Sequence, residues 1–136
     1  MAYAIGAVLA LGVALFAALS GFDRDRAFWP TVLIVVASYY DLFAVMGGSA
    51  PALGAEMAGF VLFAGMAVIG FRTSLWWVAA GLAGHGLFDF FRGGLIANPG
   101  VPVWWPAFCG AYDVVAGAWL AWRLLRERSA SAAAKR

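Results

Sequence analysis

Five ionisable side chains lie within long apolar stretches of this sequence: Asp41, Glu56, His85, Asp89 and Asp113. On insertion scales, an acidic or basic group at the centre of a membrane helix costs about 2.5–3.5 kcal/mol, and such groups usually mark functional sites. Carboxylates and an imidazole are also the side chains that most often transfer protons in enzymes. The chemistry that these residues predict is therefore acid/base chemistry.

The spacing of these residues groups them on helix faces. His85, Asp89 and Arg92 stand three or four residues apart and would form one polar stripe on a helix, and Cys109 stands four residues before Asp113. We predict that Asp89, Asp113 and His85 fill the catalytic acid/base roles. Because the carboxylates outnumber the cations in these stretches, we expect at least one carboxylate to be protonated at neutral pH.

These residues do not predict a metal site or a known cofactor. A single histidine with carboxylates could hold a hard metal ion, but a structural zinc set is missing and a haem with two histidine ligands cannot form from one histidine. We therefore predict no metal ligands and leave the cofactor unknown.

A second set of residues is predicted to bind the substrate. These residues are Asp41, Glu56, Arg92, Tyr112 and Phe88.

Composition indicates which elements must position these residues. Of 136 residues, 65% are hydrophobic and 12% are charged, whereas soluble domains average roughly 45–50% and 25%. The sequence predicts an all-α fold, an integral membrane five-helix bundle. Residues 1–128 form the transmembrane domain and residues 129–136 form a disordered cytoplasmic tail. The expected spans, each near the ~20 residues that a bilayer requires, are 2–20, 28–47, 53–71, 75–92 and 103–122.

Charge asymmetry predicts the orientation of this bundle. With five spans, eight of the nine cations fall on one side of the membrane and only Arg92 falls on the other. By the positive-inside rule the N-terminus lies outside and the C-terminus is cytoplasmic, and we expect the bacterial cytoplasmic (inner) membrane. Because the cations lie at helix ends and in the tail, the net charge of +2 does not imply a nucleic-acid partner.

Orientation and helical rise together predict depth. At 1.5 Å per residue, His85 and Asp113 lie near the midplane, while Asp41 and Asp89 lie roughly 5–10 Å toward the outside. Polar side chains can also have a purely structural role, because each hydrogen bond between membrane helices stabilises their packing by about 0.6–2 kcal/mol. Five ionisable groups in one depth range favour a functional site over this structural role.

Part of the sequence resembles small bacterial polytopic membrane proteins of uncharacterised function. The similar residues are His85-Gly86-Leu87-Phe88-Asp89, Val101-Pro102-Val103-Trp104-Trp105, Phe108-Cys109 and Tyr112-Asp113. The resemblance implies that these residues form a shared centre, and it implies no mechanism.

Three functions fit these observations. The first is binding or acid/base processing of a lipophilic, lipid- or isoprenoid-like substrate that enters an outward-opening pocket lined by the second, third, fourth and fifth spans. The second is a proton- or cation-coupled transport component that works as a homo-oligomer, and the third is an accessory subunit of a larger membrane complex. Whether the protein is an enzyme is left open. The expected aromatic walls of the pocket are Phe43, Phe60, Phe63, Phe88 and Phe108.

Overall fold

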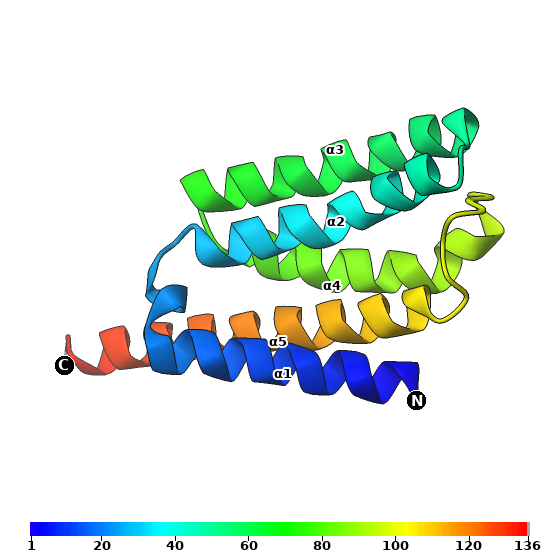
Figure 1. The fold of residues 1–136 in the computed structure, drawn as a ribbon. Coiled ribbons are helices and arrows are strands. Elements are labelled where there is room, and N and C mark those ends of the chain that lie inside the picture. The colour runs from blue at the N-terminus through cyan, green and yellow to red at the C-terminus, as the bar shows by residue number, and fades with distance from the viewer. Residues whose placement is uncertain (136) are drawn as a thin grey trace.

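The computed structural model describes residues 1–135, which form five α-helices and two short 3-10 turns and contain no strand (Figure 1). The predicted all-α class and the number of helices are confirmed. The helices are α1 (Ala2–Ser20), α2 (Phe28–Met46), α3 (Ala50–Arg72), α4 (Trp76–Phe91) and α5 (Trp105–Ala133), and the 3-10 turns are η1 (Phe22–Arg24) and η2 (Arg92–Gly94).

The helix ends agree with the predicted spans to within a few residues, except at the end of α5. This helix continues to Ala133, through most of the segment that was expected to be a disordered tail. The last residue of that segment, Arg136, lies outside the described residues. Among the described residues, α1, α2 and α3 are long and apolar enough to cross a membrane. The fourth helix, α4, has only 16 residues and then tightens into η2.

Figure 1 shows the helices side by side in the order α3, α2, α4, α5 and α1. The largest interface joins α4 to α5, and the hairpin of α2 and α3 packs against α4. Helix α1 packs along α5 and has no backbone approach to α2 within the described residues. Two helices that are consecutive in the sequence are therefore separated over most of their length.

Small residues set the closest helix approaches. Gly6 of α1 lies against the backbone carbonyl of Phe108 on α5, where no Cβ would fit. Between α4 and α5, a Cβ at Gly86 would lie 2.8 Å from the Gly110 carbonyl oxygen and 3.1 Å from the Asp113 Cβ. These glycines let the α4 and α5 backbones meet beside His85 and Asp113.

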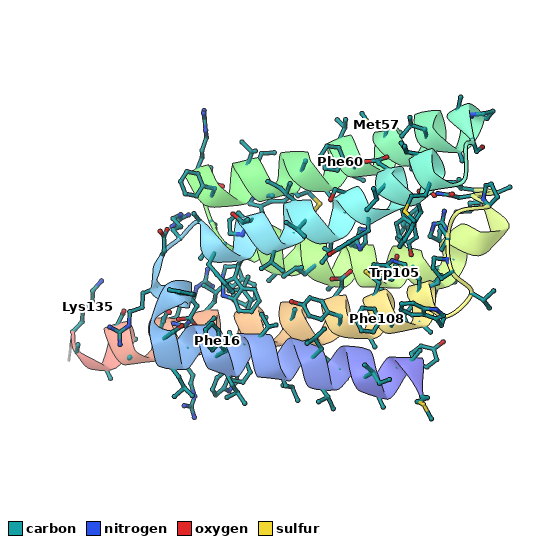
Figure 2. All side chains as sticks on the ribbon, viewed as in Figure 1. Phe16, Met57, Phe60, Trp105, Phe108 and Lys135 are labelled. Atoms are coloured by element: carbon teal, nitrogen blue, oxygen red, sulfur yellow. The ribbon has the colours of Figure 1, made fainter. Side chains whose placement is uncertain are left out.

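The two ends of the bundle differ in charge. The basic end comprises residues 21–27, residues 73–75 and the C-terminal part of α5, marked by Lys135 in Figure 2. The loop end comprises the N-terminus, residues 47–49 and residues 92–104, and Trp105 and Phe108 lie beside it (Figure 2). Arg92 is buried, so every exposed or partly exposed cation of residues 1–135 lies at the basic end.

Candidate functional site

The bundle brings five buried side chains from three helices together, and we call them the polar cluster: Tyr40 of α2, His85 and Asp89 of α4, and Cys109 and Asp113 of α5. His85 Nδ1 lies 2.7 Å from Asp113 Oδ2 and 3.9 Å from Asp89 Oδ2. The Tyr40 hydroxyl donates a hydrogen bond to Asp89 Oδ1 at 2.6 Å, and the Cys109 thiol donates to Asp113 Oδ2 at 3.6 Å. Both carboxylates therefore face one imidazole.

Two oxygen atoms of the polar cluster lack partners. Asp89 Oδ2 and Asp113 Oδ1 are buried and make no hydrogen bond within the described residues, and both side chains are 0% exposed. Buried acceptors are nearly always satisfied in native proteins, and each exception calls for an explanation such as a bound ion, a water or a catalytic role. The polar cluster thus has unused capacity to bind a proton, a cation or a ligand donor.

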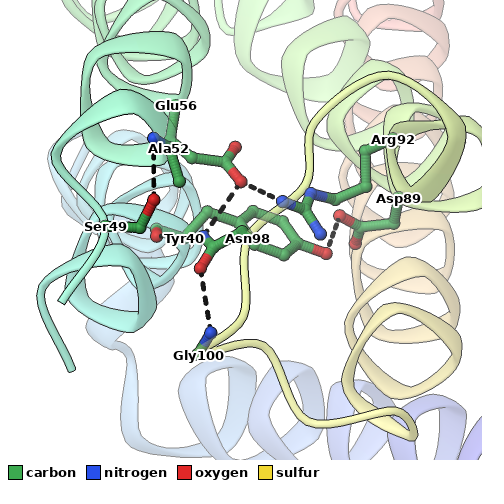
Figure 3. A network of polar contacts seen from close by, with 8 residues as sticks. All are labelled: Tyr40, Ser49, Ala52, Glu56, Asp89, Arg92, Asn98 and Gly100. Atoms are coloured by element: carbon green, nitrogen blue, oxygen red, sulfur yellow. Dashed lines mark hydrogen bonds and ion pairs between the residues drawn. The ribbon is translucent and has the colours of Figure 1, made fainter. Parts of the chain in front are cut away.

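Arg92 does not balance the charge of the polar cluster, because it forms a buried ion pair with Glu56 of α3. Its guanidinium also stacks on the Tyr40 ring, 4.0 Å from the ring centre (Figure 3). With Arg92 neutralised, Asp89 and Asp113 share only the titratable His85. Two ionised carboxylates beside one neutral imidazole would be very costly in a dry interior, so the site must hold protons or a cation.

The loop before α5 covers this network at the loop end. The Asn98 amide donates to Glu56 Oε1 at 3.1 Å and to the Tyr40 carbonyl at 3.0 Å, while Asn98 Oδ1 accepts from the Gly100 backbone (Figure 3). Gly100 and Gly47 approach so closely that a Cβ at either position would meet the backbone of the other. The loop is thus held tightly on the end of α2.

The substrate-binding residues predicted from the sequence are divided by the structure. Glu56 and Arg92 lie next to the polar cluster as the buried pair, joined to it through Tyr40. The Asp41 side chain is only partly buried. Its Oδ1 atom is buried, but it makes no hydrogen bond to the polar cluster or to any other described residue. Its neighbour Tyr40 takes the inward position instead, because adjacent residues on a helix point to different faces.

The main cavity differs from the expected pocket. It has a volume of about 800 Å³ and lies between α1, α2 and α5. Gly21 and Phe22 line it where it reaches the basic end. The expected outward-opening pocket was instead lined by all four of the second to fifth spans. Phe108 lines the observed cavity, but Phe43, Phe60, Phe63 and Phe88 do not. Phe88 packs against Phe63, with ring centres 6.4 Å apart. The cavity lies where the backbones of α1 and α2 do not approach each other.

Apolar side chains line most of this cavity, which we call the α1–α2 groove. Val32 and Val35 lie on its α2 wall and Leu9 and Val13 on its α1 wall, and α5 forms its floor. Its polar lining residues include Tyr39, Tyr112 and Cys109. Cys109 therefore belongs both to the groove and to the polar cluster, and it connects the two.

Two residues of this region, Tyr40 and Asn98, were not predicted from the sequence as site residues. Tyr39 and Tyr40 both precede Asp41, and only the phase of α2 decides which of the two points inward. Asn98 lies in an Asn-Pro-Gly stretch that is typical of a turn. No local pattern indicates that its amide would reach Glu56, which is 42 residues away in the sequence.

Comparison of the chain with models of protein families, with curated proteins and with solved structures finds no match. The resemblance to small bacterial membrane proteins therefore stays a prediction, and the function has to be inferred from the site itself.

Proposed function

We propose that this protein is an integral membrane five-helix bundle that binds a lipophilic molecule in the α1–α2 groove. The polar end of that molecule would reach Cys109 and Tyr112, beside the polar cluster. The observation that carries this proposal is the connection of an apolar cavity of about 800 Å³ to a buried His-Asp-Asp group through Cys109. Ligand sites typically combine such an apolar volume with a few converging polar groups.

The walls of the groove favour a chain-like occupant. The cavity runs along α2 from Phe28 to Tyr39, a rise of about 16 Å at 1.5 Å per residue. That length is about half of a bilayer core of ~30 Å. Both walls belong to helices that are long and apolar enough to cross a membrane. In a bilayer the groove would open sideways to lipid, so an acyl or isoprenoid chain could enter without crossing water.

The polar cluster would act on the head of such a molecule. His85 and Asp113 are within proton-exchange distance, and Asp89 lies on the other side of the imidazole. A carboxylic acid that stays protonated in a dry site can donate a proton to an apolar substrate. We assign Asp113 and His85 as the acid/base pair, with Asp89 oriented by the Tyr40 hydroxyl.

A transport role is less well supported by the packing. On the basic side of the polar cluster, Leu33 and Leu82 are both 0% exposed within a continuous apolar core. A proton or cation would need polar groups or water along its path. Binding from the membrane through the groove needs no such path.

The proposed orientation places the basic end in the bacterial cytoplasm, with the N-terminus outside. This follows from the exposed cations of residues 1–135, which lie together at the basic end. Cysteine labelling in intact cells tests it: a cysteine at Ser131 in the Cys109→Ala background should react with impermeant maleimide only after the membrane is opened. Labelling in intact cells would overturn this orientation.

The groove itself is tested by photolabelling in nanodiscs that contain a trace of phospholipid with a diazirine on one acyl chain. We expect saturable labelling of Val32 and Val35, mapped by mass spectrometry and displaced by excess unlabelled lipid. Val32→Trp should fill the groove and remove this labelling.

Val61→Trp is the matched control, because Val61 is 63% exposed on α3 and does not line the groove. It should leave the labelling of α2 unchanged. Labelling that is equally strong on α3 and α2, and that excess lipid does not displace, would contradict a specific site.

A further inference from the structure

We propose that the polar cluster is a binding site for one divalent transition-metal ion of the zinc type, with His85, Asp89 and Asp113 as ligands and Cys109 as the fourth. One donor atom from each of these buried residues lies within 4.8 Å of every other. These four residues were not predicted as metal ligands from the sequence, because a structural zinc set is missing there.

The donor types fit this class of ion. Zinc accepts imidazole nitrogen, carboxylate oxygen and thiolate sulfur, most often in a tetrahedron. Magnesium and calcium prefer oxygen ligands alone. A site that combines one nitrogen, two carboxylates and one sulfur therefore favours a borderline ion such as Zn²⁺ or Co²⁺ over the hard ions.

The distances require only small adjustments. Two nitrogen or oxygen ligands on a tetrahedral zinc lie about 3.3 Å apart, and a sulfur and an oxygen lie about 3.5 Å apart, given the usual bond lengths. Cys109 Sγ lies 3.6 Å from Asp113 Oδ2. The distances from His85 Nδ1 to the two carboxylates are 2.7 and 3.9 Å and bracket the tetrahedral value. A small rotation of the imidazole away from Asp113 would equalise them.

Charge supplies a second, independent reason. Because Glu56 neutralises Arg92, the excess negative charge of Asp89 and Asp113 has no fixed cation in the described residues. A divalent ion balances the two carboxylates. When the Cys109 thiol loses its proton to bind as a thiolate, the site carries one net negative charge in place of two, which is less costly in a low-dielectric interior. Asp89 Oδ2, which has no hydrogen-bond partner, would gain the ion as its partner.

This inference goes beyond lipid binding and does not depend on it. A bound ion would take the place of the proton between His85 and Asp113, so metal binding and proton exchange are alternative uses of the same atoms. The groove would keep its apolar occupant in either case. Cys109 would place the ion at the groove wall, where it could face the polar end of a bound molecule.

The test uses the full chain, purified in detergent, stripped with chelator and titrated with Co²⁺. We expect one equivalent to bind, with visible bands of a four-coordinate ion and a near-ultraviolet band from thiolate-to-cobalt charge transfer. Cys109→Ser should keep the visible bands and lose the charge-transfer band. His85→Gln should weaken binding by more than about 100-fold, since even outer-shell changes cost 10–100-fold.

Asp41→Asn is the matched control: it removes a carboxylate of α2 that lies outside the polar cluster, and it should leave the titration unchanged. Failure to bind one equivalent of Co²⁺, or binding that is insensitive to both His85→Gln and Cys109→Ser, would overturn the metal site. If His85→Gln does not fold, the Cys109→Ser protein still tests the site, because it should bind Co²⁺ without the charge-transfer band. Photolabelling of the groove reports separately on lipid binding, so failure of one proposal can be told apart from failure of the other.

Discussion

The two halves of this bundle are built from the same helices but bury different side chains, apolar ones in one half and ionisable ones in the other. Toward the basic end, α2, α4 and α5 meet through apolar residues such as Leu33, Val78 and Leu82, all 0% exposed. Toward the loop end, the same helices bury His85, Asp89 and Asp113, with two acceptors left unpartnered. In the apolar half, α2, α4 and α5 pack on one another without ionisable groups, and the Asp23–Arg123 ion pair there joins α5 to η1 instead. The polar half is therefore better explained by function than by assembly.

The largest expected effect lies in the polar half, at the buried ion pair. Glu56→Ala leaves the Arg92 guanidinium uncompensated and should cost about 3–5 kcal/mol of unfolding free energy, measured by denaturation in detergent. The double variant Glu56→Leu/Arg92→Met should recover much of the loss. Equal destabilisation by the single and double changes would mean that packing, and not charge, sets the cost.

Truncation in the apolar half should have the next largest effect. Leu82→Ala removes buried contacts in the centre of the core and should lower the unfolding free energy by about 2 kcal/mol. It should leave photolabelling of the α1–α2 groove and uptake of Co²⁺ unchanged. Loss of either binding activity in a folded Leu82→Ala protein would show that the two halves are not separable.

A smaller effect is expected where the halves meet at a glycine contact. Gly86→Ala should force α4 and α5 apart beside Asp113 and lower the unfolding free energy by about 1 kcal/mol. Because it separates His85 from Asp113, it should also weaken Co²⁺ binding. Gly59→Ala on α3 is the matched control: nothing lies within 4 Å of its Cβ position. Alanine there should stabilise the helix by about 0.5–1 kcal/mol. In a thermal unfolding experiment, Gly86→Ala should therefore lower the unfolding temperature and Gly59→Ala should raise it.

The smallest effect is expected at Asp41, the predicted site residue that lies outside the polar cluster. Asp41→Asn should change the unfolding free energy by less than about 0.5 kcal/mol and should not alter groove labelling. Asp89→Asn keeps an acceptor for Tyr40 and should also be mild in stability, but it should reduce binding at the polar cluster. Similar behaviour of both variants would remove the distinction between these two acids.

The sequence predicts the helices well because each is an uninterrupted apolar run with turn residues at its ends. It also predicts that His85 and Asp89 share a face with Arg92, since this depends only on helical spacing. The location of the cavity could not be predicted, because it depends on α1 packing on α5 and not on α2. The pairing of Arg92 with Glu56 and Asn98 was likewise out of reach, since it depends on how a loop folds back over the bundle.

The end of α5 shows a different limit. Residues 129–133 are helical although their small and polar side chains suggested disorder, because alanine is a strong helix former and the preceding turns have already nucleated the helix. Composition alone did not capture this continuation.

The functional assignment of the polar cluster is best tested by the double variant H85L/D113V, which replaces the His85–Asp113 pair by apolar residues of similar size. Removing both partners of a buried hydrogen bond in this way can be neutral or stabilising. We predict an unfolding temperature equal to or above that of the natural protein, together with loss of Co²⁺ binding and reduced labelling of the groove near Tyr112. A large drop in stability, with groove labelling unchanged, would show that the polar cluster holds the helices together and would contradict its assignment as a functional site.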